Sequence, residues 1–253
     1  MAAAKRLPLT LRAYHLVSRA MTPLAPAWLA YRIKRGKENP ERVTERRGQA
    51  AMERPAGPLV WVHGASVGEL LAILPLVERL RAMDFNVLVT SGTVTSANLA
   101  RDRFPPDVIH QFIPLDTPRF VAQFLNGWRP DLALFTESDI WPNLIMAATK
   151  RRIPLIIVNG RVSERSFSRW RAIHGTARAL IGRFELCLAQ SGLDANRFTQ
   201  LGAPQAVVTG NLKLDVPAPP VDNERLKMLK DAVGNRPVIA ATSTHAGEEI
   251  AMI

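Results

Sequence analysis

A regular alternation of short apolar runs with helical segments starts at residue 59 and continues to about residue 209. The short runs are β-rich, and the segments between them carry apolar residues at helical spacing. Such β-α alternation indicates an α/β fold, with a parallel sheet covered by helices on both faces. The expected strands are 59–63, 86–90, 108–113, 132–135, 155–158, 186–189 and 207–209. The expected helices are about 66–83, 95–103, 117–127, 141–151, 168–182 and 192–201.

The pattern changes after residue 214, so residues 55–214 are expected to form the α/β domain. The stretch Asp215–Val221 contains three prolines, and a charged helix is expected at about 223–233; together they suggest a linker over 215–236. Residues 237–242 then indicate a fresh strand, and 243–249 another strand–turn–helix entry. We therefore expect 237–253 to be the start of a second α/β domain, with the sequence cut shortly after its beginning.

The first 54 residues carry most of the positive charge. They contain twelve basic and four acidic residues, a net charge of +8, whereas the whole chain has a net charge of +11. A nucleic acid or an anionic membrane surface would attract such a segment. The single cysteine, Cys187, lies in an apolar run and excludes a disulfide within the chain, which fits a reducing compartment.

The apolar pattern of residues 9–24 favours a membrane surface over a nucleic acid. Seven apolar residues share one helical face, and the other face is polar or basic. Aromatic residues and more basic residues follow, which is typical of an interfacial anchor. The longest uncharged run, Ala20–Tyr31, is about twelve residues long and contains Pro23 and Pro26, too short to span a bilayer. The alternative is a helix that packs on its own domain. The seven residues of the expected apolar face are Leu9, Ala13, Leu16, Val17, Ala20, Met21 and Leu24.

The segment 59–69 combines a strand, a turn at Gly64 and a helix start. Backbone N–H groups of Ser66, Val67 and Gly68 at this helix start suit a phosphate or carboxylate. Ser66 and Glu69 have the spacing of a capping box, in which Ser66 accepts from the N–H of residue 69 and Glu69 from the N–H of residue 66. On local spacing alone, capping is the simpler role for Glu69.

Seven ordered motifs resemble those of the 3-deoxy-D-manno-octulosonic acid (Kdo) transferases of lipopolysaccharide synthesis. The resemblance runs from about residue 30 to the last residue, and the E-x-D-x-W-P-N motif is the most specific part. This motif has Asp139 where the family pattern E-x-E-x-W has its second acid. The motifs lie at 32–38 with 45–48, 63–69, 91–96, 137–143, 159–163, 210–213 and 243–248.

The resemblance implies an inverting glycosyltransferase of the two-domain GT-B type, with a Rossmann-like N-terminal domain for the acceptor and a C-terminal domain for CMP. Such enzymes transfer Kdo from CMP-Kdo to the lipid A precursor, lipid IVA, at the cytoplasmic face of the cell inner membrane. CMP-Kdo is then a substrate, and no cofactor or metal is expected. We expect the missing part of the donor domain to leave this chain inactive by itself.

The resemblance also assigns roles to residues. Glu69 corresponds to the family's general base, and Glu137 to the first acid of its acidic motif. Lys213 is our candidate for the cation that stabilises the negative charge of the leaving group. Arg161 suits an acceptor phosphate, and Asp139 shares the acidic motif. Residues Ser243, Thr244 and His245 are expected near the donor.

Some residues of these motifs also have a simpler interpretation. Glu137 suits the N-terminus of the helix that follows it, Lys213 suits a solvated strand end, and His63 a satisfied strand-end position. Two other functions stay open: a GT-B transferase with a UDP-sugar donor, and a non-catalytic lipid-binding module. Nucleic-acid binding is the weakest alternative, because the basic segment lacks interleaved aromatic residues suited to base stacking.

Overall fold

The computed structural model describes residues 7–216, 221–248 and 250. The chain divides into two compact units, Met1–Val216 and Pro217–Ile253, and each is described here by itself. Parts of three expected regions lie outside the described residues: 1–6 of the basic segment, 217–220 of the linker, and 249 and 251–253 of the expected second domain.

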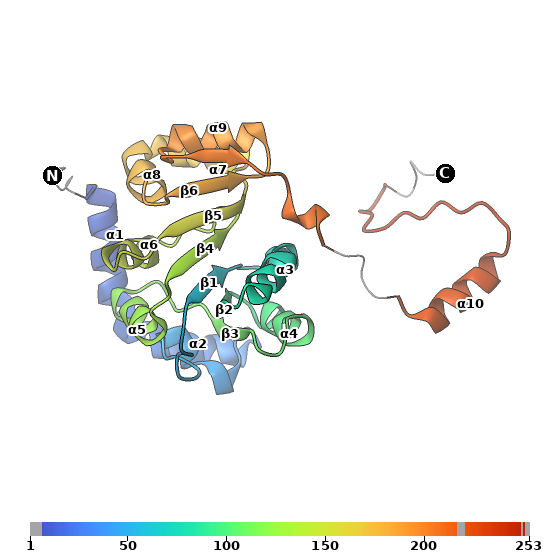
Figure 1. Cartoon of the computed structure of the whole chain (residues 1–253), viewed down its shortest axis with the longest axis horizontal. Helices are drawn as coiled ribbons and strands as arrows, with labels where there is room; N and C mark the ends of the chain where they lie inside the picture. Colours follow the sequence, from blue (N-terminus) through green and yellow to red (C-terminus); the bar gives the residue numbers. More distant parts are fainter. Residues whose placement is uncertain (1–6, 217–220, 249, 251–253) are drawn as a thin grey trace. The chain divides into compact units, whose positions relative to one another are not determined.

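Seven parallel strands form the sheet of the first unit, in the order β3-β2-β1-β4-β5-β6-β7 (Figure 1). All seven expected strands of this domain are present, with ends that differ by at most two residues. The parallel Rossmann-like fold is thereby confirmed. The strands are β1 (Leu59–His63), β2 (Asn86–Ser91), β3 (Ile109–Phe112), β4 (Leu132–Thr136), β5 (Leu155–Gly160), β6 (Leu186–Ala189) and β7 (Ala206–Val208).

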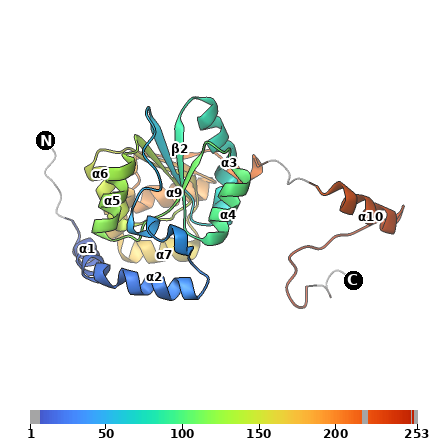
Figure 2. The ribbon, with the colours of Figure 1, turned by 90° about the horizontal axis from the view of Figure 1, so that it is seen from below.

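Helices cover both faces of the sheet, as right-handed crossovers between parallel strands require. Figure 2 shows α3 and α4 on one side of the sheet and α5 and α6 on the other. The expected helix over 168–182 is in fact two helices, α7 and α8, because the backbone of Ile173 leaves the helical region (φ −115°, ψ 44°). The helices are α3 (Val67–Ala82), α4 (Val94–Arg103), α5 (Pro118–Trp128), α6 (Pro142–Lys150), α7 (Glu164–Ala172), α8 (His174–Ile181) and α9 (Gly192–Leu201).

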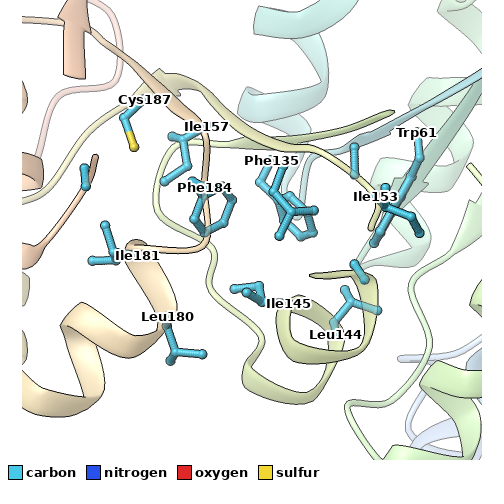
Figure 3. Packing of buried hydrophobic residues seen from close by; sticks show 14 of the residues in the cluster. Trp61, Phe135, Leu144, Ile145, Ile153, Ile157, Leu180, Ile181, Phe184 and Cys187 are labelled. Atoms are coloured by element: carbon cyan, nitrogen blue, oxygen red, sulfur yellow. The ribbon is translucent and has the colours of Figure 1, made fainter. Parts of the chain in front are cut away.

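The alternating side chains of β1 divide the core into two layers. Leu59 and Trp61 pack with the side of the sheet that α5 and α6 cover, whereas Val60 and Val62 pack with the α3 side. The ring of Trp61 meets Phe135 edge to face, with centroids 5.1 Å apart (Figure 3). All five residues of β1 are buried, so the strand is fixed in the middle of the sheet and its carboxyl end has a defined position.

The N-terminal segment packs along this domain through helices and single turns. These are α1 (Leu9–Met21), η1 (Thr22–Leu24), α2 (Ala25–Lys34), η2 (Pro40–Arg42) and η3 (Glu45–Arg47). α1 contacts α5 and α6 (Figures 1 and 2). Further along, the buried Arg46 donates from Nε to Glu38 and from Nη1 to the carbonyl of Ile113, which ties the segment to the end of β3.

The side of α1 that faces the domain is polar, which is opposite to an ordinary surface helix. Tyr14 Oη donates to Asp116 (2.9 Å), His15 Nδ1 lies 2.8 Å from Asn143 Oδ1, and Asn143 Nδ2 donates to Ser18. The one buried apolar residue among the described residues of α1 is Leu11. The expected apolar face is accordingly uncovered: Leu9, Leu16, Val17 and Met21 are all exposed.

No helix in the described part of the chain has both the length and the apolar character needed to cross a membrane.

The second unit contains one described helix, α10 (Asn223–Val233), close to the expected position. The expected strand over 237–242 and the helix entry over 243–249 are wrong for the described residues, which have neither strand nor helix there. A strand is stabilised by hydrogen bonds to a neighbouring strand, and an apolar β-rich run without a paired neighbour has no ladder to join.

Candidate functional site

The carboxyl ends of the parallel strands bring together most of the predicted site residues, as is usual for ligand sites in open α/β sheets. The carboxyl end of β1 leads through Gly64 into α3, which starts after Ser66. Glu137 directly follows β4, and Arg161 directly follows β5. Lys213 belongs to the short helix η4 (Leu212–Leu214), which follows β7 and contacts α3.

Ser66 caps α3, as the sequence predicted. Its Oγ accepts from the N–H of Glu69 (3.3 Å) and donates to Glu69 Oε1 (2.8 Å). The second half of the expected capping box is wrong in detail, because Glu69 Oε2 accepts from the N–H of Ala65 (3.0 Å) and not from that of Ser66. Both carboxylate oxygens are therefore held, and the side chain is oriented without a substrate.

The surroundings of Glu69 disfavour its charged form. Burial raises the pKa of the Glu69 carboxyl above its ordinary value, and the negative charges of Asp139 and Glu137 raise it further. The hydrogen bonds from Ala65 and Ser66 oppose this rise. The side chain is partly exposed, so it combines access from solvent with a raised pKa, which suits a group that must take a proton.

Glu137 and Lys213 form an ion pair beyond the carboxyl ends of the strands. Lys213 Nζ lies 3.0 Å from Glu137 Oε1, and both side chains are partly exposed. Glu137 has a left-handed backbone (φ 59°), a conformation that costs a glutamate about 1–3 kcal/mol and often marks functional sites. Its N–H donates to the carbonyl of Val158, which holds this conformation.

Asn159 holds the backbone next to Lys213. Its buried Oδ1 accepts from the N–H of Leu212 (3.0 Å), and its own backbone is left-handed (φ 52°). Its Nδ2 is buried and has no partner among the described residues. Asn159 begins the motif over 159–163, and no role was predicted for it. Asparagine is one of the few residues that tolerates this conformation, and that was the available signal.

Asp139 lies in a buried hydrogen-bonded chain that the sequence did not reveal. Thr90 Oγ1 accepts from Trp61 Nε1 and lies 2.9 Å from His63 Nδ1. His63 Nε2 in turn lies 2.9 Å from Asp139 Oδ2, which also accepts from Trp141 Nε1 (3.0 Å). Because an ionised carboxylate only accepts, the contact with Asp139 places a ring proton on Nε2, while Nδ1 lies near both the hydroxyl and the carbonyl oxygen of Thr90. His63 is thus satisfied, as expected of a strand-end histidine, and its partner is a predicted site residue.

These contacts keep Asp139 ionised. Burial by itself raises the pKa of the Asp139 carboxyl, but the hydrogen bonds from His63 and Trp141 and the charge interaction with His63 outweigh it and lower the pKa. Asp139 is therefore a negative charge close to Glu69, with its orientation set by two rings.

The simpler interpretation of Glu137, as the acid at the start of α6, does not match the structure. The buried Asp116 occupies that place: Oδ2 accepts from the N–H of Asn143 and Oδ1 from the N–H of Leu144, the free groups of the first turn. Because Asp116 lies 27 residues before Asn143, no local pattern indicates it. Glu137 is left to pair with Lys213.

The remaining predicted residues are placed as follows. Val67 and Gly68 lie exposed in the first turn of α3, and Arg161 is exposed and forms no side-chain hydrogen bond or ion pair with the described residues. Ser243, Thr244 and His245 belong to the second unit, which is described by itself. Within the described residues, no group of three or more His, Cys, Asp or Glu side chains could hold a metal ion.

Comparison with known proteins identifies relatives of this chain. The family model described as 3-deoxy-D-manno-octulosonic-acid transferase (kdotransferase) matches residues 41–216. The 3-deoxy-D-manno-octulosonic acid transferase of Rickettsia bellii is 34% identical over 94% of this chain and 57% of its own length. That of Bordetella pertussis is 33% identical over 95% of this chain and 58% of its own length. The chain therefore spans somewhat more than half the length of these relatives.

A similarity to solved structures concerns the fold alone. One, from Listeria monocytogenes and named for a proposed UDP-N-acetylglucosamine 2-epimerase activity, has a TM-score of 0.50 and 16% identity. It covers 70% of this chain and 52% of that protein.

Proposed function

Because the chain belongs to the 3-deoxy-D-manno-octulosonic-acid (Kdo) transferase family, we propose that the whole protein is an inverting glycosyltransferase of lipopolysaccharide synthesis. In this proposal it transfers Kdo from CMP-Kdo to the lipid A precursor, lipid IVA. The first unit supplies the acceptor side of the site. The relatives are nearly twice as long as the part matched here, so contacts to the cytidine are assigned to the other part of the whole protein.

In the proposed step, Glu69 is the general base. A hydroxyl oxygen of the acceptor attacks the anomeric carbon of Kdo, its proton passes to Glu69, and the bond to the CMP phosphate breaks on the opposite side. The observation that carries this role is the geometry of Glu69: both oxygens are held by Ala65 and Ser66 at the carboxyl end of β1. The raised pKa supports it, because the carboxylate gains from accepting a proton.

Lys213 is proposed to stabilise the negative charge of the departing cytidylate. Its ion pair with Glu137 supports this role, since the pair fixes an otherwise flexible ammonium group. With a lysine in this position, we propose that the step uses neither a metal nor a cofactor. Arg161 is exposed directly after the carboxyl end of β5. We assign its guanidinium to a phosphate of the acceptor.

We propose that the protein works at the cytoplasmic face of the inner membrane, with α1 and α2 against the lipid surface. The uncovered apolar side of α1 supports this. On α2, Trp28 and Tyr31 are also exposed, and the guanidinium carbons of Arg32 and Arg35 lie 4.8 and 5.2 Å from their ring centroids. Exposed aromatic rings paired with cations are typical of interfacial segments.

The experiment is the Glu69→Gln substitution in the full-length protein. We expect transfer of Kdo from CMP-Kdo to fall by at least about 100-fold, because general-base catalysis typically contributes about 10²–10⁴. The variant should remain folded, since glutamine keeps an acceptor for the Ala65 N–H. The matched control is Glu78→Gln, an exposed glutamate of the same helix. Wild-type turnover by Glu69→Gln would contradict the assignment, and turnover of a UDP-sugar in place of CMP-Kdo would contradict the donor.

A further inference from the structure

A groove of about 1140 Å³ lies between α1 and the helices α5 and α6 of the first unit. One stripe of α1 forms part of it, with Leu9, Ala13 and Leu16 one helical turn apart, and Met146 of α6 also lines it. This volume is somewhat larger than the usual range of small-molecule sites, which is about 300–1,000 Å³. The described lining contains no Phe, Tyr or Trp, and its one ring that could stack is the imidazole of His15.

The charged residues of the groove are all basic. Four cations line it and no carboxylate does: Arg12, Lys150, Arg151 and Arg183. The side chains of Arg12 and Lys150 form no ion pair or hydrogen bond within residues 7–216, 221–248 and 250, so both are available to an anion. Arg151 is held by Asn126 (2.8 Å) and Arg183 by the carbonyl of Ala179 (2.9 Å).

Arg183 is a partly buried cation of the groove, and burial lowers the pKa of its guanidinium. A phosphate restores the interactions that a partly buried cation has lost to desolvation. The chemistry of the groove is therefore apolar along α1 and α6 and strongly anion-binding at its charged residues.

We propose that this groove binds one molecule of an anionic glycerophospholipid. Its acyl chain lies along Leu9, Leu16 and Met146, and its phosphate pairs with Arg12 and Lys150. The uncovered apolar side of α1 continues from the groove, so a lipid there extends the proposed membrane contact. The groove proposal rests on the proposed function in one respect: the membrane that α1 is proposed to contact supplies the lipid.

Other occupants fit the groove less well. A second copy of this chain would bring a segment with a net charge of +8 against an identical one, which is unfavourable. A single-stranded nucleic acid stacks successive bases on aromatic side chains, and the described lining offers no Phe, Tyr or Trp for this. A zwitterionic lipid would satisfy the apolar stripe but leave the cations without a net counter-charge.

The test is titration calorimetry of the chain with dihexanoylphosphatidylglycerol, kept below its micelle concentration. We expect one molecule to bind per chain, with dihexanoylphosphatidylcholine and inorganic phosphate each at least about tenfold weaker. Lys150→Glu and Arg12→Glu should each weaken binding about tenfold. The control is Arg19→Glu, a cation of α1 outside the groove, which should change binding less than about twofold.

A second pair of variants tests the apolar part. Ala13→Trp fills the groove from an exposed position on α1, whereas Ala20→Trp adds the same bulk to the same helix outside the groove. We expect only Ala13→Trp to block the lipid. Three results would overturn the proposal: no binding, equal binding of phosphate or phosphatidylcholine, or self-association that the charge variants abolish in place of lipid binding. If the full-length protein binds the lipid but does not transfer Kdo, the result contradicts the proposed function and leaves the groove proposal standing.

Discussion

Glu69 shows how one set of hydrogen bonds serves both local structure and a reactive position. The contacts at the start of α3 also hold both oxygens of the carboxylate in place. The pKa of Glu69 is also raised by two acids far along the chain. Glu137 and Asp139 follow β4, whereas Glu69 lies at the start of α3. The capping interpretation and the catalytic proposal for Glu69 are compatible.

At this scale the pH dependence of the proposed reaction is predictable. Glu69 acts as a base only when it is ionised, so kcat/KM of the full-length enzyme should rise as the pH passes the raised pKa of Glu69. Asp139→Asn removes a neighbouring negative charge that raises this pKa. The pKa of Glu69 should therefore fall, and the acidic limb of the kcat/KM profile should move to lower pH.

The control for this prediction is Asp102→Asn. Asp102 is exposed and pairs with Arg101 at the end of α4, so its loss should leave the acidic limb in place. An acidic limb that stays fixed in Asp139→Asn, or moves to higher pH, would show that a different group is titrating.

At the scale of elements, the N-terminal segment is attached to the domain through the polar side of its first helix. The polar side of α1 packs inward on Asp116 and Asn143, and the apolar side is left outside. The 3.6-residue pattern correctly predicted two faces for this helix. It could not say which face the domain would cover, because the matching polar groups lie on α6 and in the loop before α5.

The turn at Gly48 gives a stability prediction for this segment. Gly48 ends η3 with φ 81°, and a Cβ added there would lie 2.0 Å from the carbonyl oxygen of Phe120. We expect Gly48→Ala to lower the free energy of unfolding by about 2–4 kcal/mol, from the left-handed backbone and the steric overlap together. Chemical denaturation of the chain measures it.

Gly36→Ala is the matched control. Gly36 also has a positive φ (66°), but a Cβ there meets nothing within 4 Å. Only the backbone cost of about 1–2 kcal/mol should appear. Equal effects of the two substitutions would show that the contact between η3 and α5 is not close.

At the scale of the molecule, charge and uncovered apolar surface coincide in the same part of the first unit. Residues 1–54 hold a net charge of +8, and α1 and α2 expose Leu9, Leu16, Trp28 and Tyr31. Monomeric soluble proteins seldom leave large apolar patches uncovered. Positive charge beside such a patch favours an anionic lipid surface.

This arrangement predicts binding to vesicles that contain phosphatidylglycerol, with affinity that falls as salt rises. The double variant Val17→Glu with Met21→Glu should weaken binding at least about tenfold, since two apolar side chains no longer enter the lipid and two acids are added. Both residues lie outside the groove. Flotation of the vesicles in a density gradient measures the bound fraction.

The control is Met228→Glu, an exposed apolar residue of α10 in the second unit. It should leave vesicle binding nearly unchanged. Equal losses in the control and in the α1 variant would indicate a general effect of charge and contradict a binding face on α1.

The strands and most helices of the first unit, the Ser66 cap and the family were predictable from the sequence alone. These depend on neighbours within a few residues, or on motifs in a fixed order. Which distant groups meet depends on the three-dimensional fold: Glu137 pairs with Lys213 and His63 with Asp139, each pair 76 residues apart, and Asp116 lies at the start of α6. The face of α1 that the domain covers and the absence of a strand over 237–242 depend on the fold in the same way. Local periodicity describes what a segment can form, whereas hydrogen bonds and burial depend on the partners that the fold brings to it.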